Sequence, residues 1–161
     1  MKYAVMVSIV VVLALSGLFL WRGGAMPETS PTTSDIRFGF ITAVEGNTIV
    51  FDEARWLTGK EGEDAAIAAG LCTEATRAEC LPNDFYIVND APTTVPLILS
   101  GDAMIAMATL HMEEEGVKET QISIEEFAKL INDSNLHWNK LPYQMIVESG
   151  EVVVLEEVYV P

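Results

Sequence analysis

The sequence predicts an α+β domain, in which short strands pair mainly in an antiparallel way and two short helices pack beside them. Two stretches, 38–52 and 142–161, place β-branched and aromatic residues on both sides of a turn, as β-hairpins do. Two other stretches show the spacing of a helix N-cap. The chain has 161 residues, 50% of them apolar, which suffices for one core but not for a parallel sheet with helical crossovers.

Residues 1–22 predict a transmembrane helix. The run from Tyr3 to Trp21 contains no charged residue and is flanked by Lys2 and Arg22, and a helix of about 20 apolar residues spans a bilayer. A cleaved signal peptide is the alternative, although the apolar run is longer than is usual for one. We therefore expect a single-pass membrane anchor with the C-terminal domain outside the cytoplasm, or a secreted protein if this segment is removed.

A tether and an acidic domain are expected after the anchor. Residues 23–35 are rich in Gly, Pro, Ser and Thr, which predicts a flexible tether before a folded domain at 36–161. The chain carries 24 acidic and 9 basic residues, a net charge of −15, and two of each sign precede the domain. Such a domain repels nucleic acid, so no nucleic-acid partner is expected. Solubility is the simplest explanation of the charge; a cation or a basic protein partner is the alternative.

The first elements of the domain are a hairpin and a helix. Residues 38–52 should form two strands joined by a tight turn at Glu45-Gly46-Asn47. Thr58 stands three residues before Glu61, which is the spacing of a capping box, and the alanine-rich run that follows ends at Gly70. This pattern predicts a short helix that depends on packing for its stability.

Three further strands are expected in the middle of the domain. Residues 85–89 and 93–100 have strand character, and Pro96 requires an edge or bulged position in the second of them. Residues 103–112 are ambiguous between strand and helix, and we take them as a strand. The following Glu113-Glu114-Glu115-Gly116 is typical of a solvated turn.

A second helix and a closing hairpin complete the domain. Ser123 begins a capping pattern, and the apolar residues after it share one helical face. Strands at 143–148 and 151–160 should turn at Ser149-Gly150. Glu156 and Glu157 must point to opposite faces, so at least one of them needs a hydrogen-bonding or basic partner. Together the elements predict a small curled sheet or an OB-like, partly open barrel.

Cys72 and Cys80 lie close together in a polar stretch. Outside the cytoplasm this spacing predicts a disulfide, which would stabilise the domain by about 2 to 3 kcal/mol. A zinc site would need further ligands, and His111 and His137 are distant in sequence. We expect neither a metal nor a cofactor.

The search for catalytic motifs finds none with complete spacing. Thr58-Gly59-Lys60-Glu61 resembles the end of a phosphate-binding loop but has Glu where Ser or Thr is required. Asp52, Asp84 and Asp90 are the carboxylates that acid/base chemistry would use. Asp52 and its neighbour Glu53 should point to opposite faces of a strand, so they are not expected to act together.

Two classes of function remain. The leading hypothesis is a membrane-tethered, non-catalytic binding domain with a protein or an envelope glycan as partner; the alternative is a cell-envelope hydrolase. An enzyme would show a concave pocket with converging polar groups, whereas an interaction domain would show an exposed apolar or aromatic patch. Trp138 lies in a polar loop and is expected to be exposed. The candidate binding surface comprises Trp56, Tyr86, Asn89, Trp138 and Tyr143.

Four short pieces follow one another in order and cover most of the domain. They are the 39–52 hairpin, Trp56-Leu57-Thr58-Gly59, Asn83-Asp84-Phe85-Tyr86-Ile87-Val88-Asn89, and the closing stretch from Pro142-Tyr143 through Gly150 to Pro161. In these pieces the domain resembles an uncharacterised family of small exported bacterial proteins, which are lipoproteins or membrane-anchored. The resemblance implies export and assigns no catalytic residue. The sequence departs from the family in its cysteine stretch and in lacking a lipid-accepting Cys after the apolar run.

Overall fold

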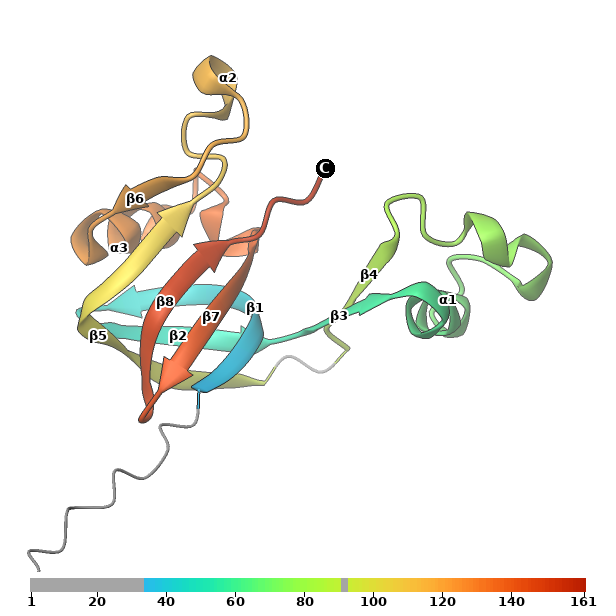
Figure 1. Cartoon of the computed structure of the whole chain (residues 1–161), viewed down its shortest axis with the longest axis horizontal. Coiled ribbons are helices and arrows are strands. Elements are labelled where there is room, and N and C mark those ends of the chain that lie inside the picture. Colours follow the sequence, from blue (N-terminus) through green and yellow to red (C-terminus); the bar gives the residue numbers. More distant parts are fainter. Residues whose placement is uncertain (1–33, 91–92) are drawn as a thin grey trace, which may run out of the picture. The chain divides into compact units, whose positions relative to one another are not determined.

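The computed structural model describes residues 34–90 and 93–161 (Figure 1). The expected anchor at 1–22 and nearly all of the expected tether lie outside these residues. Within the described residues, no helix has the length and apolar character that crossing a membrane requires. The first described strand begins at Ser34, inside the last residues of the expected tether.

Five strands form a closed barrel: β1 (Ser34–Glu45), β2 (Thr48–Glu53), β5 (Thr94–Met107), β7 (Pro142–Glu148) and β8 (Glu151–Glu157). The order around the barrel is β1, β2, β5, β8, β7 and back to β1. All of these pairings are antiparallel except β5 with β8, which is parallel. The sheet is therefore mostly antiparallel, as expected, but the ladder between β2 and β5 closes the barrel that the sequence predicted to be partly open.

Both predicted hairpins are confirmed. β1 and β2 pair around Gly46, and β7 and β8 pair around Ser149 and Gly150. Ser149 and Gly150 have φ angles of 53° and 89°, the positive values that a two-residue hairpin turn requires. β8 ends at Glu157, however, and not at residue 160.

β5 is one continuous strand where the sequence suggested two. Its first part pairs with β2, with Pro96 opposite Val50, and its pairing with β8 begins only at Ile98. At Pro96 the other edge of β5 faces no strand among the described residues, which explains how a residue without an N–H is accommodated. A register shift between Leu99 and Met104 then bends the strand into its second part. β6 (Thr120–Ile122) extends the sheet from β5.

The core fills the barrel and continues under α3 (Ile124–Asn132). The predicted cap is present, because the Ser123 hydroxyl accepts a hydrogen bond from the Glu126 N–H. At the end of the helix the Asn132 side chain bonds the N–H and carbonyl of Val44, which fastens α3 to β1. The largest fully buried side chains are Ile41, Ile49, Phe51, Leu99, Ile105, Met107, Phe127, Ile131, Tyr143, Met145, Val152 and Leu155.

Gly39 allows β1 and β2 to cross closely. A Cβ atom at this position would lie 2.2 Å from the carbonyl oxygen of Asp52 and 2.9 Å from the Phe51 ring. Such contacts are too short for any side chain, so only glycine fits here.

The segment between β2 and β5 forms a second, smaller unit of structure, called the arm (55–88). It contains β3 (Arg55–Thr58) paired with β4 (Phe85–Val88), together with α1 (Gly59–Ala68) and the 3-10 turn η1 (Glu74–Glu79). The α1 helix is predicted correctly, but Thr58 makes no side-chain cap hydrogen bond, so the expected capping box is wrong.

The predicted disulfide is confirmed in the arm. Cys72 and Cys80 are bonded, with their Cα atoms 5.5 Å apart. Arg77, within the closed loop, binds Glu74 and reaches Glu63 and Asp64 of α1 at 3.1 and 2.7 Å. Hydrogen bonds from Lys60 and Arg77 lower the pKa of Asp64, and a hydrogen bond from Arg77 lowers that of Glu74. The disulfide thus closes the loop, and the ion pairs of Arg77 hold the closed loop against the helix.

Two short elements replace expected turns. The acidic triplet expected as a turn lies in α2 (Met112–Glu115), a single exposed helical turn. A second 3-10 turn, η2 (Trp138–Lys140), precedes β7 and contacts β1.

Candidate functional site

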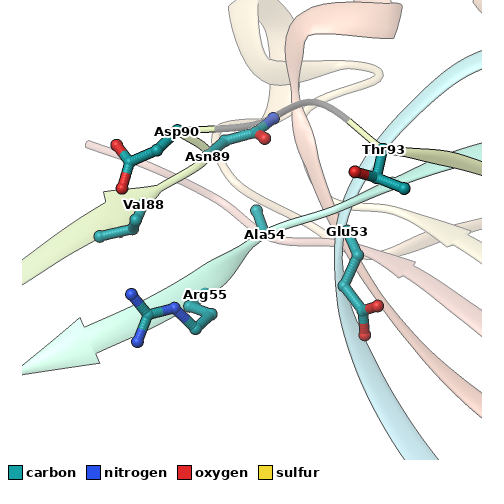
Figure 2. Close-up of a pocket in the computed structure, with 7 residues that line it drawn as sticks. All are labelled: Glu53, Ala54, Arg55, Val88, Asn89, Asp90 and Thr93. Carbon is teal, nitrogen blue, oxygen red and sulfur yellow. The ribbon is translucent and has the colours of Figure 1, made fainter.

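The chain passes from the barrel to the arm at Ala54, between β2 and β3, and this junction forms one candidate site. The Ala54 N–H donates to the Phe38 carbonyl at 2.9 Å, which holds the junction against β1. Beside it lies a cavity of about 490 Å³. The lining residues, drawn in Figure 2, are Glu53, Ala54, Arg55, Val88, Asn89, Asp90 and Thr93.

Asp52 joins the two sides of this junction. Its side chain is buried, with 7% exposure, and its two oxygens accept hydrogen bonds from the Thr93 N–H at 3.0 Å and the Asn89 amide at 2.9 Å. Asn89 Oδ1 is itself buried and has no hydrogen-bond partner among the residues that the structure describes. Because both Asp52 oxygens are engaged by neutral donors from the other side of the junction, this carboxylate is a structural link.

The other charged groups of the junction do not converge on one point. Glu53 points away from Asp52, as predicted, and pairs with Arg37 at 2.8 Å, whereas Arg55 lies 3.6 Å from Glu61. In Figure 2, Arg55 and Asp90 occupy one end of the cavity while Glu53 and Thr93 occupy the other. The cavity therefore lacks a pair of carboxylates aimed at a common substrate position.

Asp84, the third carboxylate proposed for an enzyme, is remote from this cavity. It precedes β4, whereas Asp90 follows that strand, so the two lie at opposite ends of it. Asp84 has a φ of 61° and donates its N–H to the Leu81 carbonyl, which makes it a turn residue. Asp52, Asp84 and Asp90 are thus not assembled into one catalytic group.

The predicted aromatic surface is divided between the two faces of the arm. Trp56 stacks on Phe85, with ring centroids 3.9 Å apart, and its edge meets Phe38 of β1 at 5.5 Å. Tyr86 is opposite Leu57 in the β3–β4 ladder and hence lies on the other face, beside the alanines of α1. One face of the Trp56 ring is therefore covered by Phe85.

Tyr143 lies in the core and not on a binding surface, and Trp138 packs beside it. Tyr143 is 0% exposed, and its hydroxyl donates to the Trp138 carbonyl at 3.1 Å. Trp138, expected to be exposed, is half-buried and packs against the barrel core. Alternation along β7 had correctly grouped Tyr143 with Met145 and Val147, and that shared face is the inner one.

A feature that the sequence reasoning missed lies on the outside of the barrel. Ile36 is opposite Ile146, Ile146 is opposite Val154, and Val154 is opposite Met104, so four apolar side chains form one row across four strands. We call this set the apolar row. Ile36 is 66% exposed and Met104 37%, while the two central residues are partly exposed. Their neighbours in sequence, such as Met145 and Leu155, are fully buried inside.

Carboxylates flank the apolar row on both sides. Toward the hairpin tip, Glu148 and Glu151 are opposite each other, one pair beyond Val147 and Val152. On the other side of the row, Glu156 lies opposite Gln144. Among the described residues, none of these three carboxylates forms an ion pair. The surface around the row is therefore apolar at its centre and negative at its edges.

Within the described part of the chain, no three His, Cys, Asp or Glu side chains gather as a metal site would require. Comparison with known proteins gave no match: no protein-family model, curated protein or solved structure is significantly similar to this chain.

Proposed function

We propose that this chain is a membrane-tethered, extracytoplasmic interaction domain that binds a partner without catalysis. The observation that carries the proposal is the apolar row, because its partly to largely exposed apolar side chains lie outside the barrel core. Exposed apolar patches with polar borders commonly mark interaction surfaces. The hydrolase alternative has less support, since its candidate carboxylates are separated or structurally engaged.

Two features support the proposed compartment. Disulfides such as Cys72–Cys80 persist mainly in oxidising environments outside the cytoplasm. The uncharged run from Tyr3 to Trp21 is long enough for a membrane span, which we propose as the anchor. Membership of the exported bacterial family that the sequence resembles would agree with both features.

We also propose an OB-like class for the barrel. Five strands with Greek-key connections and a helix before the fourth barrel strand support this assignment. In such barrels the loops of the first and last hairpins commonly wall a ligand groove. Here both hairpins have tight turns, at Gly46 and at Ser149-Gly150. The acidic charge and these short turns favour a protein partner over an oligonucleotide.

Site-specific photo-cross-linking tests the interaction function. A photoreactive amino acid replaces Met104 in the apolar row, or Glu113 on α2 as an exposed control, in cells that make the protein natively. We expect a discrete cross-linked adduct from position 104 and none from position 113. Equal adducts from both positions, or no adduct from either, would contradict the proposed interaction function.

Protease access tests the topology. In intact cells with a permeable outer layer, added protease should degrade the domain, while the full chain should stay with the membrane after an alkaline wash. Protection of the domain until the cells are lysed would contradict an extracytoplasmic location. Release by the wash would contradict the anchor.

A further inference from the structure

A small acidic pocket adjoins the apolar row. It has a volume of about 220 Å³ and is lined by Ala106, Ala108, Val117, Glu119, Glu156 and Glu157, a set that we call the acidic pocket. Ala106 and Glu156 are opposite each other in the β5–β8 ladder, two residues beyond the pair formed by Met104 and Val154. Because residues two apart on a strand share a face, Ala106 and Glu156 lie on the outer face that carries the apolar row. The Glu157 side chain points to the opposite face, where its carboxylate bonds Ala108 and Thr109.

The pocket combines an apolar wall with unneutralised charge. Two alanines and Val117 supply the wall, and three glutamates supply carboxylates. Glu157 is 7% exposed and accepts hydrogen bonds from the N–H groups of Ala108 and Thr109 and from the Thr109 hydroxyl. These donors are neutral, and among the described residues no Lys, Arg or His pairs with Glu119, Glu156 or Glu157. Within the described part of the chain, the negative charge of the pocket therefore has no positive counterpart.

This combination suits a particular side chain. Lysine and arginine carry a charged head on an apolar stem, and they lay the stem along apolar surface while the head reaches polar groups. A bare metal ion fits less well, because the described carboxylates do not gather as metal ligands. The apolar row beside the pocket spans three strand spacings, roughly 14 Å, which suits several apolar side chains of one continuous segment.

We propose that the apolar row and the acidic pocket together bind a cationic amphipathic segment of a partner protein. Its apolar side chains cover Ile36, Ile146, Val154 and Met104, and a lysine or arginine enters the acidic pocket, while Glu148 and Glu151 attract further basic residues. This inference rests on the proposed interaction function and adds the chemistry of the partner to it. The domain's large negative charge would accelerate the encounter with such a segment.

Methyl NMR of the full chain in zwitterionic nanodiscs tests the proposal, because every residue of the apolar row carries a methyl group. The probe is a synthetic peptide of alternating leucine and lysine; empty nanodiscs report its binding to lipid. We expect shifts at the methyls of the apolar row and at Ala106, with Leu71 and Leu136 as unaffected exposed references. A peptide of alternating leucine and glutamate should not bind.

Matched variants separate the two parts of the surface. Ile36→Asn combined with Met104→Gln should weaken binding of the leucine–lysine peptide about tenfold. Glu119→Gln combined with Glu156→Gln should weaken it by a similar factor and reduce its dependence on salt. Glu113→Gln combined with Glu114→Gln on α2 changes the net charge equally and should leave the affinity unchanged.

The outcomes distinguish the partner's chemistry from the function itself. Binding of the leucine–glutamate peptide at the apolar row, or equal losses in the two glutamine pairs, would overturn the cationic partner while the interaction function stands. The same holds if the leucine–lysine peptide causes no shifts but the Met104 cross-link still forms. Absence of both the shifts and the cross-link would overturn both proposals.

Discussion

Tyr143 and Glu157 are opposite each other in the β7–β8 ladder, and both side chains are buried. Burial raises the pKa of the Tyr143 phenol well above its usual range, and the nearby charge of Glu157 raises it further. The carboxylate in turn holds the chain after β5 through three hydrogen bonds from Ala108 and Thr109. The buried Glu157 carboxylate thus connects β8 to the residues that follow β5, and the groups that donate hydrogen bonds to it there are neutral.

Replacing Glu157 should destabilise the domain strongly. Glu157→Ala leaves the N–H groups of Ala108 and Thr109 without their acceptor, and each buried donor that loses its partner costs roughly 1 to 3 kcal/mol. We expect a loss of at least about 2 kcal/mol in the free energy of unfolding, measured by denaturant titration. Glu156→Ala, on the outer face of the same strand, should cost less than about 0.5 kcal/mol. Similar losses in the two variants would contradict the structural role of Glu157.

Tyr143 should make the domain sensitive to alkali. Its pKa in the folded state is raised above the ordinary value of 10.0, so the phenol loses its proton first in the unfolded chain. The stability that Tyr143 contributes is therefore fully present below pH 10 and is lost as the pH rises beyond it. Tyr143→Phe should be less stable at pH 7, because it lacks the hydrogen bond to Trp138, but should decline less steeply in alkali. Parallel pH profiles of unfolding free energy for the two proteins would contradict this.

Two glycines should respond in opposite ways to the same substitution. Gly39→Ala places a Cβ 2.2 Å from the Asp52 carbonyl, so β1 and β2 must separate, and we expect a loss of more than about 2 kcal/mol. Gly101 has no neighbour within 4 Å of the added Cβ, and Gly101→Ala should be neutral or slightly stabilising. Thermal unfolding of both variants provides the measurement, and a tolerated Gly39→Ala would mean that this strand crossing is less close.

Removing the disulfide should weaken the arm more than the barrel. The bond closes a loop with a sequence separation of 8, for which chain entropy predicts about 2.5 kcal/mol. In a Cys72→Ser and Cys80→Ser variant we expect faster hydrogen exchange in α1, with core strands such as β7 little affected. Dithiothreitol should reproduce this effect in the wild type and have none in the variant. Equal acceleration in arm and barrel would show that the two unfold as one unit.

Deleting residues 151–161 should unfold the domain. β8 lies between β7 and β5, so its removal opens the barrel and leaves hydrogen-bonding groups of both neighbours unpaired. Circular dichroism of the truncated chain should show no cooperative thermal transition. A transition near the midpoint of the full chain would mean that the closing hairpin is dispensable.

The parts of this fold that sequence patterns predict are local. Alternation of apolar residues and a Ser-Gly turn identify the closing hairpin. Because neighbouring residues on a strand point to opposite faces, the sequence also indicates that either Glu156 or Glu157 points inward and needs a partner. Barrel closure depends on the pairing of β2 with β5, which are separated by the whole arm, and no local pattern reports such a pairing. The sequence predicts two strands where β5 is one, and the two residues between them, Gly101 and Asp102, lie in its register shift.

The candidate site was harder to predict for a related reason. Ile146 and Val154 are visible as outward positions by alternation, but Ile36 and Met104 join them only through the register of four strands. Tyr143 is predicted on the binding surface because it is aromatic, but the type of a side chain does not indicate which face of a strand is buried. Tyr143 lies two residues before the buried Met145 on the same strand, so alternation from Met145 places Tyr143 in the core.

The arm begins and ends at positions that are already neighbours in the barrel. Asp52, shortly before it, is paired with Thr94, shortly after it, across the β2–β5 ladder, where strands lie about 5 Å apart. The arm's own ladder pairs Arg55 with Val88, so its fold brings its two ends together. The loop-closure cost that it adds to the barrel then rises only slowly with its length. The barrel therefore accommodates the arm as an insertion between two paired strands. The arm can be lengthened, shortened or exchanged in evolution without changes in the strands β2 and β5 that flank it.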